Sequence, residues 1–253
     1  MASLWRSMAR RPCCGPACGA GKRCVRKLQM VRGPVSGDDR CRYPATGCFP
    51  SLPSTMRVHL QSYSHVSLHR LFLAFPLTIV ATHGRSVVRR RGHERLLVPG
   101  HDVTIEPFET IDMHLDGSSG QPSSCTFEIR RGMPGTPQDA LHQRISRRVF
   151  LQPQYAWSAG FIAERIDMPA TQLRRLLFSQ GTALTDLCRT QRLMRLLFEA
   201  MAGDVAMADL KRFVGWPPNG DVESAFYDRF GVSVQTARRL ASHRVPELRR
   251  SIA

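Results

Sequence analysis

The last hundred or so residues of the chain repeat one pattern twice: a short amphipathic helix, a tight turn and a second amphipathic helix. In the first repeat, an apolar-periodic run over 159–166 is followed, after a break at Pro169, by a helix expected over 169–180. Proline is tolerated in a first helical turn, and Gly181 follows where helices commonly end. The apolar face of this helix is formed by Leu173, Leu176 and Leu177. This order is that of a helix-turn-helix unit.

The second repeat follows a longer helix, which we expect over 184–202. A short helix over 207–214, a turn over 215–220 and a further helix over 221–230 complete the pattern. The last helix carries apolar residues at i, i+4 and i+8, namely Val222, Phe226 and Phe230. Arginines recur every three residues along the long helix, and we interpret them as a solvated face or a phosphate-side surface: Arg189, Arg192 and Arg195.

Two runs of residues carry a more specific motif. The first is Ala-Glu-Arg-Ile-Asp-Met-Pro-Ala-Thr-Gln-Leu-Arg-Arg-Leu-Leu (163–177). The second combines Gly-Trp (215–216) with Phe-Tyr-Asp-Arg-Phe-Gly-Val-Ser-Val-Gln-Thr-Ala-Arg-Arg (226–239). They resemble the first helix-turn-helix, and the signature around the second, of the AraC/XylS family of bacterial transcription regulators. The similarity covers about residues 155–240, and a tandem pair in order is more specific than a single motif.

The resemblance implies which residues read base edges in the major groove. In the first unit these are Thr171, Arg174 and Arg175, whose i, i+3 and i+4 spacing places them on one face. Arginine at such a position favours guanine through its O6 and N7 atoms. In the second unit the corresponding positions hold Asn219, Gly220, Glu223 and Ser224.

The second unit departs from the family pattern. Gly220 has no side chain with which to read a base, and Glu223 is repelled by phosphate, although it could accept a hydrogen bond from cytosine N4. Lys211 stands where the family usually carries a small residue. We therefore expect the first unit to carry most of the specificity. The alternative is that Arg174 and Arg175 are ordinary surface arginines.

Upstream of the helices, residues 56–131 have the pattern of β structure. Short β-branched runs alternate with turns at Gly84, Gly92 and Pro99-Gly100. The expected strands are 77–80, 86–88, 96–98, 103–105, 111–115 and 126–129. The run 91–107 resembles the turn region of a cupin-type sensor domain. The predicted fold class is α+β, with a small β-rich, cupin-like N-terminal region followed by an all-α tandem helix-turn-helix domain over 151–241.

Three further segments lie outside these two parts. Residues 1–55 are rich in Arg, Gly, Pro and Cys without any period, so we expect a disordered basic arm or an upstream extension of the reading frame, with the start at Met56. A zinc or redox role for the cysteines there is the less favoured alternative. Residues 132–150 are expected to be a linker, most rich in Gly and Pro over 132–140. Residues 242–253 form a basic tail.

The formal net charge of +16 favours a polyanionic partner. Together with the family resemblance, it predicts binding to double-stranded DNA. The resemblance also favours an activator, with RNA polymerase and a small-molecule or protein effector as further partners. No run is long and apolar enough to span a bilayer, and the N-terminus lacks a signal-peptide core. We therefore expect a cytoplasmic protein without a membrane partner.

No catalytic or metal-binding constellation is evident in the sequence. The histidines of the β region lack the His-x-His arrangement of metal-binding cupins: His83, His93, His101 and His114. The carboxylates there are expected to pair with the arginines of 85–95, a run that could also contact DNA, an acidic partner or an anionic effector. We expect neither an enzyme nor a cofactor. Two alternatives stay open: a cupin-type metal enzyme with a helical appendage, and a degenerate regulator that acts through protein contacts.

Overall fold

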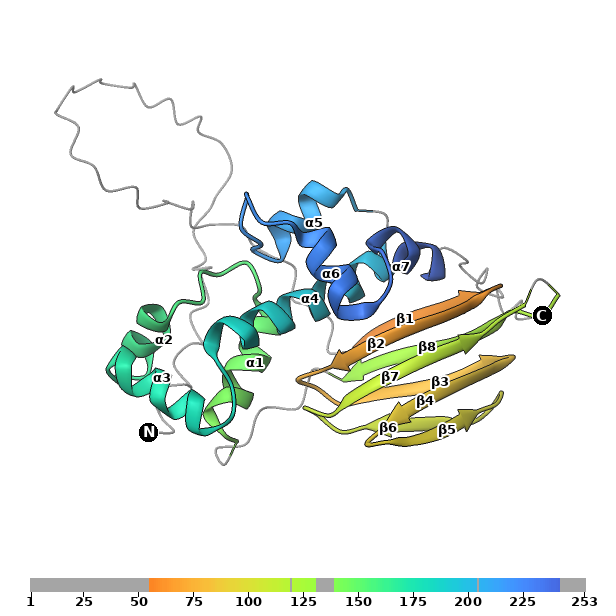
Figure 1. The fold of residues 1–253 in the computed structure, drawn as a ribbon, viewed down its shortest axis with the longest axis horizontal. Helices are drawn as coiled ribbons and strands as arrows, with labels where there is room; N and C mark the ends of the chain where they lie inside the picture. Colours follow the sequence, from red (N-terminus) through yellow and green to blue (C-terminus); the bar gives the residue numbers. More distant parts are fainter. Residues whose placement is uncertain (1–54, 119, 131–138, 204, 242–253) are drawn as a thin grey trace, which may run out of the picture. The chain divides into compact units, whose positions relative to one another are not determined.

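The computed structural model describes residues 55–118, 120–130, 139–203 and 205–241. Within these ranges an all-β part precedes an all-α part along the chain (Figure 1), and the predicted α+β class is confirmed. The expectations for residues 1–54 and for the tail 242–253 lie outside the described residues.

In the described part of the chain, eight strands form two antiparallel four-stranded sheets around a common apolar core. They are β1 Thr55–Ser62, β2 His65–Phe72, β3 Leu77–His83, β4 Arg85–Arg90, β5 His93–Leu97, β6 Asp102–Ile105, β7 Thr110–Asp116 and β8 Ser123–Arg130. One sheet has the order β1-β8-β3-β6 and the other β2-β7-β4-β5. The consecutive strands β1 and β2 therefore lie at an edge of each sheet.

The strands bury alternate residues, as a sheet with one apolar face requires. On β7, Ile111, Met113 and Leu115 are buried, whereas Asp112 and His114 lie on the other face. The expected strands correspond to β3 through β8, but β1 and β2 were not predicted individually. The apolar pattern of β2 is broken by a bulge between Leu68 and Leu71, where Arg70 adopts a φ of 50°.

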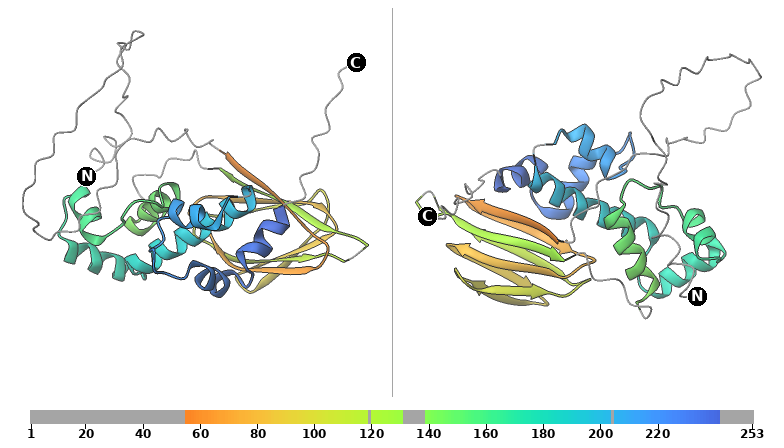
Figure 2. Two further views of the ribbon diagram at one scale, coloured as in Figure 1. Left: turned by 90° about the horizontal axis from the view of Figure 1, so that it is seen from above. Right: turned by 180° about the vertical axis from the view of Figure 1, so that it is seen from behind.

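The all-α part contains seven helices among the described residues. They are α1 Leu141–Leu151, α2 Ala159–Arg165, α3 Ala170–Ser179, α4 Leu184–Ala202, α5 Met207–Phe213, α6 Val222–Phe230 and α7 Val234–Ala241. Their order along the chain can be followed in the two views of Figure 2. Helices α2 to α6 lie where the periodicity places them, within one residue at each end.

Two differences from the predicted helices concern α1 and α7. Helix α1 occupies the second half of the segment 132–150, which we expected to be a linker. The helix forms because Leu141, Ile145 and Val149 share a buried face, a pattern that the intervening arginines obscure. Helix α7 was not predicted as a separate element. It follows the left-handed Gly231, which ends α6.

The buried apolar residues form two separate cores, one larger than the other. The first helix-turn-helix unit, α1 to α3 with the start of α4, encloses its own core around Ile145, Ile162 and Leu173. The second unit, the rest of α4 with α5 to α7, shares one continuous core with the two sheets. Helix α7 packs on β1, α6 packs on β2, and α4 contacts both strands. The second unit therefore covers the sandwich edge formed by β1 and β2.

The arginine face expected on α4 is not a solvated surface. Arg189 is exposed, but Arg192 is half-buried and Arg195 is fully buried. The Arg195 guanidinium donates to Glu199 Oε1 at 2.7 Å and to the carbonyl oxygen of Phe150 in α1 at 3.3 Å. It also lies 5.2 Å from the ring centroid of Phe213 in α5. One buried cation therefore connects α1, α4 and α5, and the prediction for Arg192 and Arg195 was wrong.

We predict that Arg195→Ala lowers the free energy of unfolding by about 3–5 kcal/mol, because it leaves Glu199 without its counter-ion and opens a cavity among three helices. Arg189→Ala, an exposed change on the same helix, should alter it by no more than about 0.5 kcal/mol. Urea unfolding followed by circular dichroism measures both. Equal effects of the two changes would contradict the role given to Arg195.

Candidate nucleic-acid interface

Helix α3 presents a polar, basic face to solvent. Thr171, Arg174 and Arg175 are all exposed, because Leu173 and Leu177 bury the opposite side of the helix in the core of the first unit. Neither of the two guanidinium groups bonds to another described residue. The structure thus brings the three predicted reading residues of this unit together on one accessible helix face.

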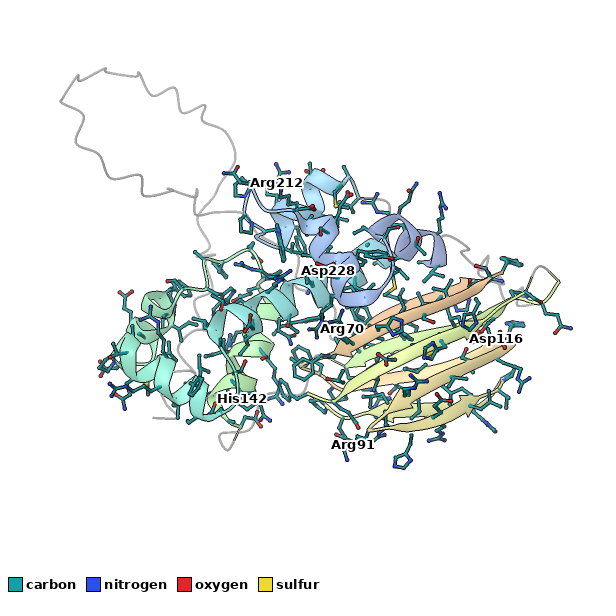
Figure 3. All side chains as sticks on the ribbon, viewed as in Figure 1. Arg70, Arg91, Asp116, His142, Arg212 and Asp228 are labelled. Atoms are coloured by element: carbon teal, nitrogen blue, oxygen red, sulfur yellow. The ribbon has the colours of Figure 1, made fainter. Side chains whose placement is uncertain are left out.

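Both ends of α3 are held in place, the first by turn geometry and the last by hydrogen bonds. Asp167, in the turn before the helix, has a φ of 51°, and Pro169 caps the helix instead of occupying its first turn. At the other end Gln180 accepts two hydrogen bonds from His142 of α1, from the backbone N–H at 3.1 Å and from the ring Nδ1 at 3.0 Å. His142 is labelled in Figure 3. Sequence periodicity gave no sign of this contact, because its partners are 38 residues apart.

The residues of the second unit that we predicted to read bases differ in their exposure to solvent. Asn219, Glu223 and Ser224 are exposed, but Gly220 is half-buried against the Trp216 indole, and a Cβ there would lie 2.8 Å from Trp216 Nε1. Gly220 is thus required by packing in the turn. The Lys211 ammonium donates to the carbonyl oxygen of Pro218 at 2.6 Å, so it holds the same turn.

The two central helices also differ in charge. Helix α3 contains two arginines and no acidic residue. Helix α6 contains Glu223 and Asp228, both exposed, together with a half-buried Arg229, and it is capped by Asp221. Asp228 is labelled in Figure 3. The approach of a polyanion is therefore favoured at α3 and opposed at α6.

The C-terminal end of α6 is held against the sandwich. Arg70 of β2 donates through Nε to the carbonyl oxygen of Arg229 at 3.1 Å. Gly231 lies so close to His69 that a Cβ would be 2.7 Å from His69 Cδ2. Burial, followed by the nearby charges of Arg70 and Arg189, lowers the pKa of Arg229. Arg70 of β2 and Arg189 of α4 therefore both act electrostatically on Arg229 of α6.

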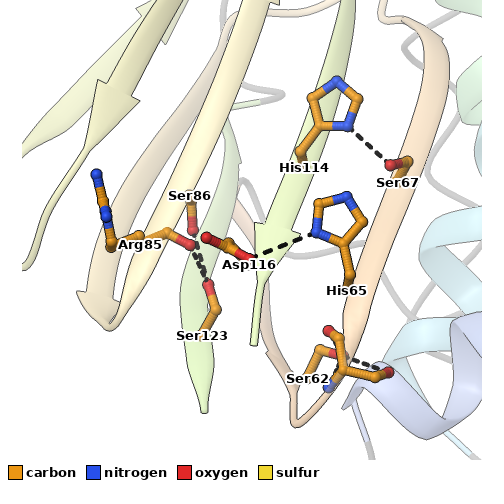
Figure 4. A network of polar contacts seen from close by, with 9 residues as sticks. Ser62, His65, Ser67, Arg85, Ser86, His114, Asp116 and Ser123 are labelled. Carbon is orange, nitrogen blue, oxygen red and sulfur yellow. Dashed lines mark hydrogen bonds and ion pairs between the residues drawn. The ribbon is translucent and has the colours of Figure 1, made fainter. Parts of the chain in front are cut away.

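The outer face of the second sheet carries a polar network (Figure 4). His65 lies 3.5 Å from Asp116, and Ser67 shares a hydrogen bond of 2.7 Å with Nδ1 of His114. Burial first, and then the charge of Arg89, lower the pKa of His114. His83, His93 and His101 are exposed. Among the described residues, no group of three or more His, Cys, Asp or Glu side chains is arranged to hold a metal ion.

The arginine run of the β region is largely engaged in local pairs. Arg89 pairs with Glu94, and both Arg90 and Arg91 lie 2.9 Å from the buried carboxylate of Glu109. The expected pairing of carboxylates with this run is thus confirmed for these two carboxylates. In the part of the chain that the structure describes, none of the helices combines the length and the apolar character that a membrane span needs.

Solved structures provide a comparison for the whole arrangement. ToxT from Vibrio cholerae superimposes with a TM-score of 0.58 at 9% sequence identity, over 76% of this chain and 100% of that chain. The chain has the fold of ToxT. A second structure of ToxT, bound to an unsaturated fatty acid, matches with a TM-score of 0.58 and 9% identity over 77% of this chain and 98% of that chain. The AraC-like architecture expected from the sequence is confirmed at the level of the fold.

A shorter match is a DNA-binding transcriptional dual regulator from Escherichia coli, with a TM-score of 0.40 and 15% identity over 44% of this chain and 100% of that chain. No protein-family model and no curated protein matches the sequence.

The two units of this fold share α4, and one loop also connects them. Arg192 of α4 donates to the carbonyl oxygens of Pro153 at 3.1 Å and Tyr155 at 2.9 Å. On the other side of the loop, Gly215 of the second unit has a φ of 62°, and a Cβ there would lie 2.6 Å from the same Pro153 oxygen. Because Arg192 holds that oxygen, the loop cannot move away freely.

Gly215→Ala should therefore lower the free energy of unfolding by about 2–3 kcal/mol, through left-handed strain and a backbone clash. The matched control is Gly160→Ala, within α2 and without close neighbours, which should raise it by about 0.5–1 kcal/mol. Denaturant unfolding of both variants tests this; a neutral Gly215→Ala would show that the loop is not a fixed contact.

Proposed function

We propose that the chain is a sequence-specific DNA-binding transcription regulator that reads the major groove mainly through α3. The observation that carries the proposal is the exposed face of Thr171, Arg174 and Arg175 on a helix without acidic residues. The fold shared with ToxT supports the same reading. No enzymatic activity is part of the proposal.

In this mechanism α3 enters the groove with its basic face toward the bases. A guanidinium fork can bond guanine O6 and N7 together, and such a bidentate pair contributes about 1–3 kcal/mol of discrimination. Arg174 and Arg175 are consecutive, so they point about 100° apart around the helix and address different base pairs or opposite walls of the groove. Thr171, one turn earlier, reaches a neighbouring base pair.

In this proposal the second unit mainly positions the first unit on the DNA. Asn219, Glu223 and Ser224 are accessible to DNA in this proposal, but Glu223 and Asp228 repel phosphate and Gly220 has no reading group. The attachment of α6 to β2 further supports a role in holding the first unit at the groove. By the family resemblance, the DNA-bound chain contacts RNA polymerase and activates transcription, which transcription from a promoter bearing the selected site would test.

The first test is selection of DNA sequences by the full chain, followed by footprinting of the selected site. Arg174→Ala or Arg175→Ala should weaken binding to that site by about 1–3 kcal/mol and relax the preference at one base pair. Asn219→Ala and Glu223→Ala should have smaller effects, and Glu223→Ala should not weaken binding.

Three outcomes would contradict this assignment. Equal weakening of all sequences by both arginine variants would make these arginines phosphate contacts. Salt-sensitive binding without any footprint would favour the degenerate regulator. A stoichiometric, tightly held metal in the purified chain would favour the cupin-type enzyme.

We also propose an anionic effector site at Arg70, Arg189 and Arg229. The charges of Arg70 and Arg189 disfavour the charged form of the half-buried Arg229, and its buried Nε has no hydrogen-bond partner among the described residues. A carboxylate between them would relieve both costs. ToxT has been solved with an unsaturated fatty acid, which is also a carboxylic acid.

Calorimetric titration of the full chain with oleate, below its micellar concentration, tests the effector site. Arg229→Gln should weaken binding at least tenfold, because it removes the most buried of the three charges. Arg212→Gln, which changes an exposed arginine of α5 paired with Asp209, should bind as the unchanged chain does. Equal affinities for all three proteins, or no binding to any, would refute the site.

A further inference from the structure

Phe178, in the last turn of α3, is exposed to an unusual degree. Its relative exposure is 82%, against 59% for Tyr227 and 48% for Tyr63, the next most exposed large apolar side chains among the described residues. The ring therefore contributes little to the apolar core of the first unit. Packing within the core therefore does not account for the aromatic ring at this position.

The position of Phe178 on the helix connects it with the proposed reading face. It follows Thr171 by seven residues, Arg174 by four and Arg175 by three, so it lies on the same side of α3. Three or four residues correspond to about 4.5–6 Å along a helix axis. Base pairs are spaced by about 3.4 Å, so with α3 in the major groove the ring would lie one or two base pairs from those that the arginines reach.

The chemistry of the ring limits what it can recognise there. Phenylalanine neither donates nor accepts hydrogen bonds, so the polar base edges and phosphates offer it no favourable partner. The apolar group that the major groove presents is the C5-methyl group of thymine, and phenylalanine is among the side chains that contact it. Burying a methyl group against an apolar ring contributes about 0.8 kcal/mol, or about fourfold in affinity.

We propose that Phe178 is a specificity-determining residue that contacts a thymine methyl group, so that α3 prefers a thymine one or two base pairs from the guanine read by Arg174 or Arg175. The inference rests on the proposed function, since it requires α3 to lie in the major groove. It adds an apolar contact to a reading face that otherwise consists of a hydroxyl and two guanidinium groups.

The test uses the DNA site selected by the full chain, with deoxyuridine replacing thymidine at one position at a time. Uracil keeps the base-pairing groups and removes only the methyl group. At one thymine close to the guanine, the replacement should weaken binding about fourfold. Phe178→Ala should weaken binding to the thymine site to a similar or greater extent, and should be insensitive to uracil at that position.

Three further measurements separate this contact from general effects. Tyr227→Ala removes another exposed ring, on α6, and should keep the sensitivity to uracil. Phe178→Ala should unfold at the same temperature as the unchanged chain, because the ring is not part of the core. Replacing cytosine by 5-methylcytosine at the proposed position should recover affinity for the unchanged chain and not for Phe178→Ala.

The outcomes distinguish the two levels of the proposal. Specific binding that is indifferent to uracil at every thymine, or a uracil effect that persists in Phe178→Ala, overturns the role of Phe178 and leaves the proposed function standing. Failure to select any specific site overturns both.

Discussion

The apolar core shared by the two sheets and the second helix-turn-helix unit is the constraint on which the rest of the structure depends. Strands β1 and β2 are edge strands, and they would leave apolar residues in water if nothing covered them. Helices α4, α6 and α7 close this edge. The second unit is thereby part of the sandwich. The first unit forms its own core and is connected to the rest through α4, a short loop and Phe150 of α1, which belongs to the shared core.

This division gives the two similar motifs different physical properties. In the first unit the accessible face of α3 is basic, and its two guanidinium groups bond to no other residue that the structure describes. In the second unit α6 is acidic on its exposed side and attached to β2 at its C-terminal end, where Arg70 donates to the Arg229 carbonyl. The proposal that α3 reads DNA while the second unit holds it in place follows from this contrast in charge and attachment.

Much of this arrangement could be predicted from the sequence, because it is encoded locally. The leucines of α3, the glycines that end α3 and α6, and the span of α4 all follow from periodicity and turn chemistry. The roles of Arg192 and Arg195 could not be predicted, because their carbonyl partners at residues 150–155 are about forty positions away and leave no local pattern. Strand β2 was missed because its bulge disrupts the alternation. The proximity of Arg70 to Arg229, 159 residues apart, likewise depends on how the sheet and the helices pack.

The separate core of the first unit also bears on how such a chain can change over evolutionary time. Substitutions on the exposed face of α3 touch neither the core of their own unit nor the sandwich, so their effects on stability should be small and nearly additive. Substitutions around α6 also affect the packing of the sheet, since the helix and β2 share a core. If α3 reads DNA as proposed, recognition of a new DNA sequence can therefore arise through single substitutions on α3, while the second unit remains under the selection that maintains the fold.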